Sequence, residues 1–409
     1  MNKIFLILIL IIGVGIVTPV QVGNTPQITF ISFPPKIKAD DAVLGFVGFK
    51  DHDGNLVKAM FTVVQAKDFQ SFILDPSVKG VKEGFFVFQL AAKNPQKVVL
   101  QLTLIDETGH RSQPQEFSFE VIKPRSPLRV HQDFSTIEQA LVAALPGDTI
   151  LIGPGTYSEH LVITKDVTLK GSGRGKTILK GFKDSWAIVQ VTSNALLHVT
   201  LQDLTLTNAV NQASLIITGK AWATVHRVTI SHSSQNGIIV QDQALLDVED
   251  SEIVQNDGTG VIAFDHALVS IRNSLVSENR TMGEAPWPRL LGRGIALRDS
   301  SQAWIVGNRV TQHDYAGISL GQASRAIIYE NILASNYDGI DIGYTDAENE
   351  SSQIKISHNT IQGSWFCGVR VEEAEKSIQV IGEGNRFVSN YQDLCPPQYP
   401  WPPSFREGG

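Results

Sequence analysis

Residues 308–340 read NRVTQHDYAGISLGQASRAIIYENILASNYDGI and contain one pattern twice. Asn308 and Asn331 each precede a short apolar segment, and a Gly-Ile pair follows later in each copy. A pattern that returns at a fixed period of about 20 to 50 residues is the signature of a stacked repeat array. The same markers recur along much of the chain.

The apolar residue that follows the turn returns at intervals of 24, 23, 23, 34, 23, 28 and 26 residues. These positions are Leu206, Ile230, Ile253, Val276, Val310, Leu333, Ile361 and Phe387. Glycine permits a tight corner, and asparagines stacked in register can hydrogen-bond along a column. Because one coil cannot bury its own apolar face, the repeat predicts about eight marked coils that share a core. The two long intervals place insertions at residues 280–291 and 344–351.

Residues 134–159 predict how the array begins. Phe134–Leu145 have a helical pattern with Ser135 as the expected N-cap, and Gly155-Thr-Tyr-Ser-Glu159 follows after Pro146-Gly147. This arrangement resembles the first coil of pectin-lyase-like proteins, in which a short helix covers the open end. The resemblance covers roughly residues 130–394. It implies a right-handed parallel β-helix, which we assign to residues 129–394.

Residues 25–123 have a different pattern, in which apolar residues alternate with polar ones in short runs. Examples are Gln27–Phe33, Val43–Phe49, Val98–Leu104 and Glu116–Val121. Alternation at period two, interrupted by turn residues, predicts a β-sandwich. The segment resembles the immunoglobulin-like modules that precede other domains in bacterial and archaeal surface proteins. The predicted fold class is therefore all-β, with a sandwich followed by a β-helix and its short capping helix.

The N-terminus predicts export. A single positive charge at Lys3 precedes the apolar run Ile4–Val17, which suits a signal-peptide core better than a span of about 20 residues. We expect residues 1–22 to be a signal peptide or an uncleaved anchor, which would provide the only membrane contact. The expected location is extracytoplasmic: secreted, periplasmic or on the cell surface.

Composition narrows the possible partners. The 409 residues are 42% hydrophobic and 18% charged, with a net charge of -7, which suits a folded protein and argues against a nucleic-acid binder. Export would permit a disulfide between Cys367 and Cys395, although two free thiols remain an alternative. Residues 395–409 are rich in proline and aromatic residues, and we expect an extended tail that covers the last coil.

The sequence contains only fragments of the motifs of two enzyme families that have this fold. Polygalacturonases need an Asp-Asp pair and a Gly-His-Gly segment beside the Asn336–Asp341 region, and both are missing. Pectin methylesterases share the Gly155–Glu159 turn, but their second aspartate segment is absent. The repeat itself accounts for most of what remains.

The best candidate site is the set Asp338, Asp341 and Arg370, with His313 one coil earlier. Asp341 and Arg370 occupy equivalent positions in successive coils, so their backbones should lie about 5 Å apart. The alternative is a salt bridge on a solvated face. Trp304, Tyr315 and Tyr337 are candidates for stacking on sugar rings.

These features favour a structural or glycan-binding β-helix protein with polysaccharide or cell-envelope glycan as its partner. The alternative is a lyase or epimerase acting on acidic polysaccharide, so whether the protein is an enzyme stays open. No cofactor is expected, except calcium if the protein is a lyase. A third possibility resembles the periplasmic β-helix proteins that assist metal-enzyme maturation, but the sequence has no His/Cys/Met ligand cluster to support it.

Overall fold

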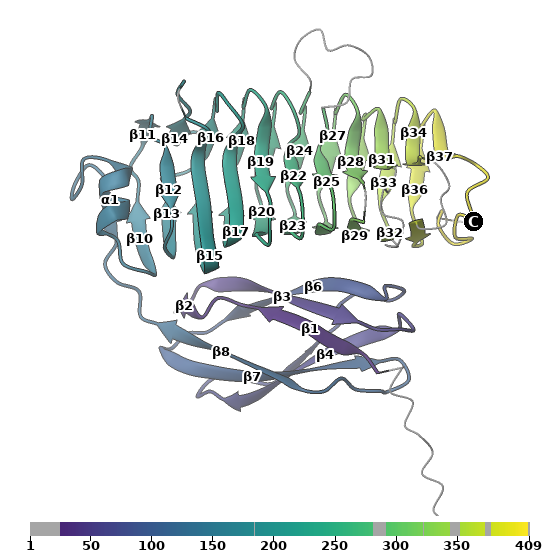
Figure 1. The fold of residues 1–409 in the computed structure, drawn as a ribbon, viewed down its shortest axis with the longest axis horizontal. Coiled ribbons are helices and arrows are strands. Elements are labelled where there is room, and N and C mark those ends of the chain that lie inside the picture. Colours follow the sequence, from purple (N-terminus) through teal and green to yellow (C-terminus); the bar gives the residue numbers. More distant parts are fainter. Residues whose placement is uncertain are drawn as a thin grey trace, which may run out of the picture.

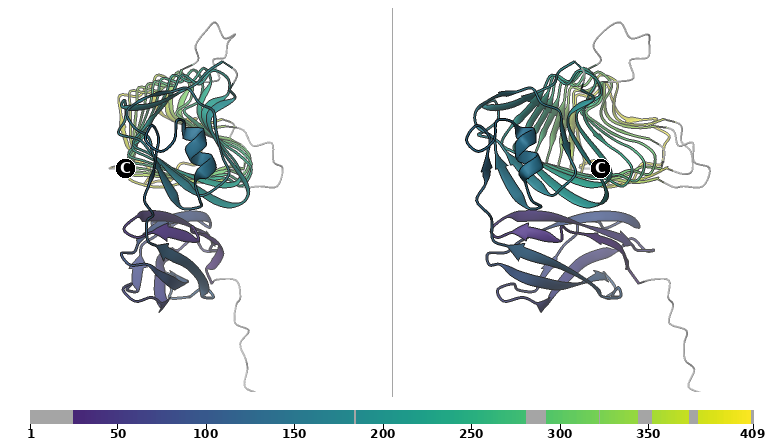
Figure 2. Two further views of the ribbon diagram at one scale, coloured as in Figure 1. Left: turned by 90° about the vertical axis from the view of Figure 1, so that its left-hand side faces the viewer. Right: turned by 60° about the vertical axis from the view of Figure 1, so that its left-hand side comes forward.

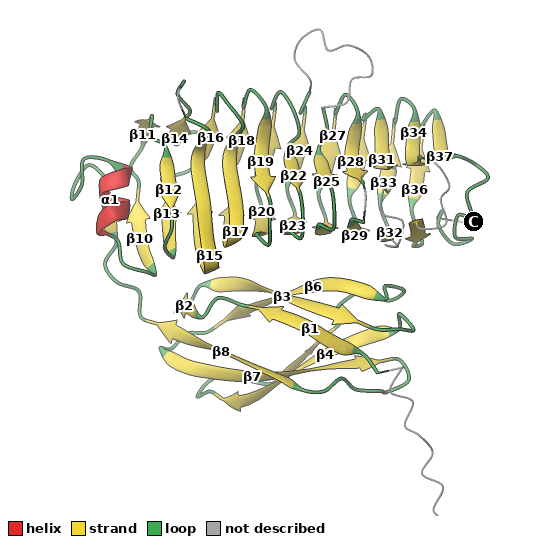
Figure 3. Cartoon of the chain, viewed as in Figure 1, coloured by secondary structure: helices red, strands yellow, loops and turns green. Residues whose placement is uncertain are grey.

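The computed structural model describes residues 25–183, 185–280, 292–321, 323–343, 352–372 and 378–407. These residues form a β-sandwich that lies alongside a right-handed parallel β-helix (Figures 1 and 3), so the predicted fold class is confirmed. The expected signal segment and both expected insertions lie outside the described residues, apart from Arg280. None of the helices within the described ranges is long and apolar enough to cross a membrane.

The sandwich consists of two sheets with a core of phenylalanine, leucine and valine side chains between them. The sheet nearer the β-helix has the order β1 (Gln27–Ser32), β3 (Ala42–Lys50), β6 (Glu83–Ala91). The other has the order β2 (Lys36–Lys38), β8 (Gln115–Ile122), β7 (Gln96–Asp106), β4 (Leu56–Gln65), β5 (Phe72–Leu74). The alternating runs of the sequence thus supply one face of each strand to this core, and in β3 the opposite face is buried as well, against the β-helix.

A short helix, α1 (Ile137–Ala143), closes the open end of the β-helix (Figure 2). The prediction of Ser135 as its N-cap was wrong: Thr136 is the cap, and its side chain accepts a hydrogen bond from the backbone N–H of Gln139 at 3.1 Å. Glu159 accepts two further hydrogen bonds, from the N–H groups of Ile137 (3.1 Å) and Glu138 (2.9 Å). The glutamate of the Gly-Thr-Tyr-Ser-Glu turn therefore satisfies helix N–H groups that have no partner within the helix.

Each coil of the β-helix contributes strands to three parallel sheets. The sandwich-facing sheet contains β9 (Leu128–Arg129), β10 (Asp148–Leu151), β13 (Val167–Lys170), the second halves of β15 (Ala187–Gln202) and β17 (Ala213–His226), β20 (Leu245–Glu249), β23 (Leu268–Arg272), β26 (Gln302–Val306), β29 (Arg325–Tyr329), β32 (Ser352–Ser357) and β35 (Ile378–Ile381). The lateral sheet contains β12 (Leu161–Ile163), the first halves of β15 and β17, β19 (Asn236–Val240), β22 (Val261–Ala263), β25 (Ile295–Leu297), β28 (Ala316–Leu320), β31 (Asp338–Ile342), β34 (Cys367–Val371) and β37 (Gln392–Cys395).

The short-strand sheet shows the predicted repeat most directly. It contains β11 (Gly155–Tyr157), β14 (Thr177–Lys180), β16 (Thr205–Thr207), β18 (Thr229–Ser231), β21 (Glu252–Val254), β24 (Leu275–Ser277), β27 (Arg309–Thr311), β30 (Ile332–Ala334), β33 (Thr360–Gln362) and β36 (Arg386–Val388). All eight repeat positions from Leu206 to Phe387 are register partners from one coil to the next. Tyr157 and Leu179 extend the same column toward the helix cap.

The predicted asparagine column is also confirmed. The Oδ1 atom of Asn331 accepts hydrogen bonds from the backbone N–H and the side-chain amide of Asn308, at 2.9 and 3.0 Å. Asn359 does the same for Asn331, and Asn385 for Asn359. The column satisfies buried backbone groups at one corner of the coils, and so fixes the stacking register.

Two features close the C-terminal end of the β-helix. Tyr399 and Phe405 from the tail are buried against the core, with Trp401 packed beside them, so the tail does cover the last coil. A disulfide joins Cys367 to Cys395, with 6.2 Å between their Cα atoms. The bridge links β34 to β37, the last two strands of the lateral sheet.

The sandwich packs closely against the β-helix. Phe46 from β3 and Trp222 from β17 are fully buried, with ring centroids 5.2 Å apart in an edge-on arrangement. Nearer the C-terminus, Lys355 donates hydrogen bonds to the backbone oxygens of Ser77 and Lys79 at 3.1 and 2.9 Å. Apolar contacts and hydrogen bonds therefore hold the two domains together along the sandwich-facing sheet (Figure 1).

Candidate functional site

The lateral sheet carries the charged cluster that the repeat register predicts. Asp341 in β31 and Arg370 in β34 are register partners in adjacent coils. Both lie next to inward-facing residues in their strands, such as the fully buried Ile340, so their side chains leave the opposite face. Asp338, at the start of β31, pairs in register with Cys367, whose backbone N–H donates to its Oδ1 atom at 3.0 Å.

Arg370 is the centre of the cluster. Its guanidinium lies 2.8 Å from Asp338 and 3.0 Å from Asp341. It also lies 2.6 Å from Glu372, and it donates a 2.6 Å hydrogen bond to the hydroxyl of Tyr315. The side chain of Asp338 is fully buried, while that of Glu372 is 39% exposed. One cation therefore faces three carboxylates, two of which have little or no access to water.

This imbalance shows in the pKa values of the carboxyl groups. The pKa of Asp338 is raised to about 7, chiefly by burial; Arg370 opposes the shift and the nearby Asp341 contributes to it. Burial also raises the pKa of Asp341, again against the effect of Arg370. Because two buried carboxylates share one guanidinium, the pair takes up a proton at a higher pH than an exposed aspartate does.

Tyr315 joins the charged groups to a second arginine, Arg293, and Arg298 lies in the same sheet region. The guanidinium of Arg293 lies 4.6 Å from the centre of the Tyr315 ring and that of Arg370 lies 5.5 Å away. Arg298 donates to Ser319 at 3.4 Å and forms no ion pair with a carboxylate of the described residues. Burial raises the pKa of Tyr315 well above its usual range and lowers the pKa of Arg298. Tyr315 therefore stays protonated, and a bound anion would stabilise the charge of Arg298.

An aromatic column runs beside these charges. Tyr337 and Phe366, which lie just before β31 and β34, stack with ring centroids 5.5 Å apart and an 18° angle between their planes. The guanidinium of Arg370 lies 5.9 Å from the centre of the Phe366 ring. Farther along, Trp365 and Tyr391 are each 75% exposed. The lateral sheet thus combines half-exposed aromatic rings with arginine side chains on one surface.

His313 does not join Asp338, Asp341 and Arg370. It lies inside a second column of buried polar side chains, where its backbone N–H donates to Asn336 at 3.1 Å. Its ring nitrogens face the backbone of Asn279 at 3.3 Å and the oxygen of Val276 at 3.1 Å. Burial lowers the pKa of His313 to about 4. The residue takes the place of an asparagine in the column.

The three predicted sugar-stacking residues separate in the structure. Tyr315 and Tyr337 lie in the surface around Arg370. Trp304 instead packs between the β-helix and the sandwich, where it contacts the apolar groups of both domains. Its side chain therefore contributes to domain docking, which the repeat pattern gave no means of predicting.

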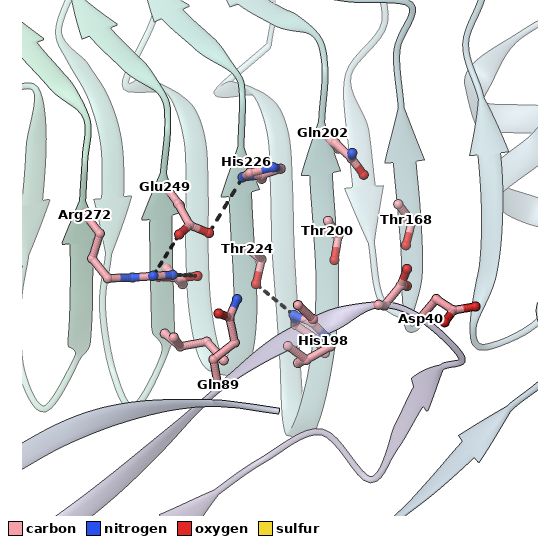
Figure 4. A pocket seen from close by; sticks show the side chains of 15 residues that line it. Asp40, Gln89, Thr168, His198, Thr200, Gln202, Thr224, His226, Glu249 and Arg272 are labelled. Carbon is pink, nitrogen blue, oxygen red and sulfur yellow. Dashed lines mark hydrogen bonds and ion pairs between the residues drawn. The ribbon is translucent and has the colours of Figure 1, made fainter. Parts of the chain in front are cut away.

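Sequence reasoning missed a cavity of about 280 Å³ between the two domains (Figure 4). Its β-helix wall is made by Thr168, His198, Thr200, Gln202, Thr224, His226, Asp247, Glu249 and Arg272, and its sandwich wall by Asp40–Leu44 and Gln89. His198 hydrogen-bonds Thr224 at 2.9 Å, and Arg272 contacts Asp247 at 3.2 Å and Glu249 at 2.8 Å. The repeat pattern can predict that these polar residues lie in register in successive coils. It cannot predict that the sandwich covers them.

Across the described residues, no group of three or more His, Cys, Asp or Glu side chains is arranged to hold a metal ion. Asp338 and Asp341 of the lateral sheet instead contact Arg370.

Comparisons with known proteins give one family match. The family model described as the right handed beta helix region matches residues 213–390, in agreement with the fold. No curated protein matches the sequence.

Among the solved structures that this chain is similar to are three of low sequence identity. The A-module of a mannuronan C-5 epimerase from Azotobacter vinelandii is 15% identical, covering 65% of this chain and 94% of that one, with a TM-score of 0.41. The catalytic unit of an alpha-1,3-glucanase from Streptomyces thermodiastaticus is 12% identical, covering 86% and 90%, with a TM-score of 0.28. A PKD domain of a peptidase from a Thermoplasmatales archaeon is 12% identical, covering 25% and 99%, with a TM-score of 0.21.

Proposed function

We propose that this right-handed parallel β-helix protein binds an acidic polysaccharide on its lateral sheet. The observation that carries the proposal is that the half-exposed, stacked rings of Tyr337 and Phe366 share one surface with the arginine side chains around Tyr315. Aromatic faces pack on the C–H faces of sugar rings, and arginine pairs with carboxylates. A polymer of uronic acids offers both features at every residue.

Arg298 provides the charge that such a ligand would meet. The charge of Arg370 is already matched by three carboxylates. Arg298, in contrast, forms no ion pair with any carboxylate of the residues that the structure describes. Burial lowers the pKa of Arg298, and the nearby Asp341 opposes this shift without cancelling it, so a bound carboxylate would stabilise the charge of Arg298 further. Ligand specificity would then rest on Arg298 and affinity on the aromatic column.

The disulfide supports an extracytoplasmic location for this function. Bridges such as Cys367–Cys395 persist in oxidising compartments and are rare in the cytosol. Together with the apolar N-terminal segment, this fits a secreted, periplasmic or surface protein that meets envelope or environmental glycans.

A second candidate function is acid–base chemistry on the same polymer. The observation in its favour is the cluster in which Arg370 contacts Asp338, Glu372 and the hydroxyl of Tyr315, and in which burial raises the pKa of Asp338 to about 7. In a lyase or epimerase a base removes the proton α to the uronate carboxylate. Asp338 is fully buried and would act by positioning Arg370, so Tyr315 and Glu372 are the groups of the cluster that could touch substrate.

Affinity and turnover can be measured on the same preparations. We expect the purified protein to bind polygalacturonate or alginate, but not uncharged dextran, in calorimetric titrations. Arg298→Gln should weaken binding about tenfold or more, as expected for loss of a charge-assisted hydrogen bond. The control is Arg227→Gln, since Arg227 lies in the turn after β17, away from the lateral sheet, and pairs there with Asp203.

The enzymatic alternative has its own measurement. Absorbance of unsaturated products reports a lyase, and the uronate ratio in NMR spectra of the polymer reports an epimerase; both are followed with and without calcium. Turnover that disappears in Tyr315→Phe would establish the enzyme. Binding without turnover would leave a glycan-binding protein, and failure to bind either acidic polymer would refute the proposal.

A further inference from the structure

The cavity between the domains is a second polar site, and the proposed function does not use it. It lies on the sandwich-facing sheet, whereas Arg370 and its neighbours lie on the lateral sheet. Its volume of about 280 Å³ is close to the lower end of the range for small-molecule sites, about 300 Å³. Both domains line it, so an occupant would contact the sandwich and the β-helix at once (Figure 4).

A row of hydroxyl groups forms one wall of the cavity. Thr168, Thr200 and Thr224 are register partners in three successive coils, so their side chains repeat at about 4.8 Å. Gln202 lies two residues beyond Thr200 on the same strand and adds an amide. Opposite them, β6 presents Gln89. This wall offers donors and acceptors at short, regular intervals, which suits a ligand with several hydroxyl groups.

The charged groups of the cavity are largely engaged with one another. Arg272 contacts both oxygens of Asp247 at 3.2 Å and one oxygen of Glu249 at 2.8 Å. Its guanidinium is therefore matched by two carboxylates and is not set up to receive an anion. At the other end Asp41 lies near Lys38, whose Nζ atom donates to the hydroxyl of Thr168 at 2.9 Å, so the charges there also face one another within the protein.

One buried nitrogen in the wall makes no hydrogen bond to the residues that the structure describes. The Nδ1 atom of His226 makes no hydrogen bond within the described residues, and the nearest carboxylate oxygen, on Glu249, is 3.8 Å away. A buried polar atom without a partner costs free energy that a bound hydroxyl would recover. Leu44 and Val43 lie across the cavity and supply an apolar surface, as the C–H face of a sugar ring requires.

We propose that this cavity binds a neutral sugar residue between the two domains. The threonine row and Gln202 would receive its hydroxyl groups on the β-helix side, and Gln89 would receive one from the sandwich. A neutral ligand follows from the internal pairing of Arg272 with its two carboxylates and from the balance of Asp41 by Lys38. The competing occupant is ordered water, which can satisfy the same polar groups.

The test is saturation-transfer NMR on the full chain, with D-glucose, D-galactose and D-mannose as separate probes and glycerol as an acyclic comparison. We expect transfer from the protein to at least one hexose and not to glycerol. Thr200→Val and Thr224→Val remove single hydroxyls with little change of shape, and each should weaken hexose binding about fivefold to tenfold. The control is Thr360→Val, a half-buried threonine of the short-strand sheet, which should bind like the wild type.

Gln89→Ala provides a second variant whose folding is not in question, because Gln89 is exposed on the edge of the cavity. It should also weaken binding, since the ligand is held from both domains. The proposal is overturned if none of the three hexoses shows transfer, which would leave only water in the cavity. It is equally overturned if binding survives unchanged in both threonine variants. Titrations with acidic polymer monitor the lateral sheet independently in the same variants.

Discussion

Cys367 donates its backbone N–H to the Oδ1 atom of Asp338 at 3.0 Å, and its sulfur is bonded to Cys395. One residue thus connects the disulfide to the buried carboxyl of the charged cluster. Cys395 is in turn the register partner of Arg370. The bridge therefore holds the coil that follows the cluster, and local order at Asp338 and Arg370 should depend on it.

Removing the bridge should lower stability. Replacing both cysteines by serine opens a loop with a sequence separation of 28 residues, which in the chain-entropy account costs about 3 to 4 kcal/mol. Urea unfolding of the double variant against the oxidised wild type measures the loss. Wild-type protein kept under reducing conditions is the matched control and should show a similar loss. Equal stability in all three samples would mean that β37 is held by packing alone.

Removing the positive charge of Arg370 should lower the free energy of unfolding, and the size of this loss should depend on pH. Arg370→Met leaves Asp338 and Asp341 buried without their counter-charge, which should cost about 3 to 5 kcal/mol at pH 8. Without Arg370 the folded-state pKa values of both carboxyls rise further above their unfolded values. A carboxyl with a raised folded pKa favours the native state at low pH, so the deficit should shrink when the pH falls from 8 to 5.

Denaturant unfolding at the two pH values checks this expectation. Arg227→Met is the comparison, because Arg227 pairs with Asp203 but is 41% exposed, and such pairs contribute about 1 kcal/mol or less. If the loss of unfolding free energy in Arg370→Met is small, or grows as the pH falls, Arg370 does not pair with two buried, charged carboxylates.

Domain docking can be tested at Phe46. Phe46→Ala removes a fully buried ring that meets Trp222 across the interface, and should cost about 3 to 5 kcal/mol. Because the interface belongs to both domains, the thermal transition should also separate into two steps that the wild type does not show. Scanning calorimetry measures both effects. Ile73→Ala, at a 61% exposed position in the same sandwich, should leave a single transition.

The parts of the molecule that follow from the repeat were predictable. Register alone places Asp341 beside Arg370, and stacked turns alone imply the hydrogen bonds from Asn308 to Asn331. The sequence could not reveal that Trp304 is covered by the sandwich, because docking depends on two surfaces with no shared period. Nor could it separate His313 from the cluster, because the sequence does not show whether the side chain of a histidine in a turn points into the coil or out of it.

His313 gives the sharpest pH prediction. Its ring performs two tasks that asparagine performs in neighbouring coils: Nε2 donates to the oxygen of Val276, and Nδ1 accepts from the N–H of Asn279. Asn279 and Asn336 likewise donate to the oxygens of Ile253 and Val310, each at 3.1 Å. Because both ring nitrogens are engaged this way, the imidazole is neutral, and His313→Asn should preserve the column at neutral pH.

The pKa of about 4 for folded His313 lies below the ordinary value of 6.5. Between these two values the unfolded chain takes up a proton that the folded chain does not, so the wild type loses stability as the pH falls from about 6.5 to 4. The loss from this one residue approaches about 3 kcal/mol at pH 4. His313→Asn removes it, so the stability of the variant relative to the wild type should improve by that amount over this range. Comparing the two proteins by urea unfolding at several pH values cancels the other titrating groups, and a constant difference across the range would show that His313 titrates normally in the folded protein.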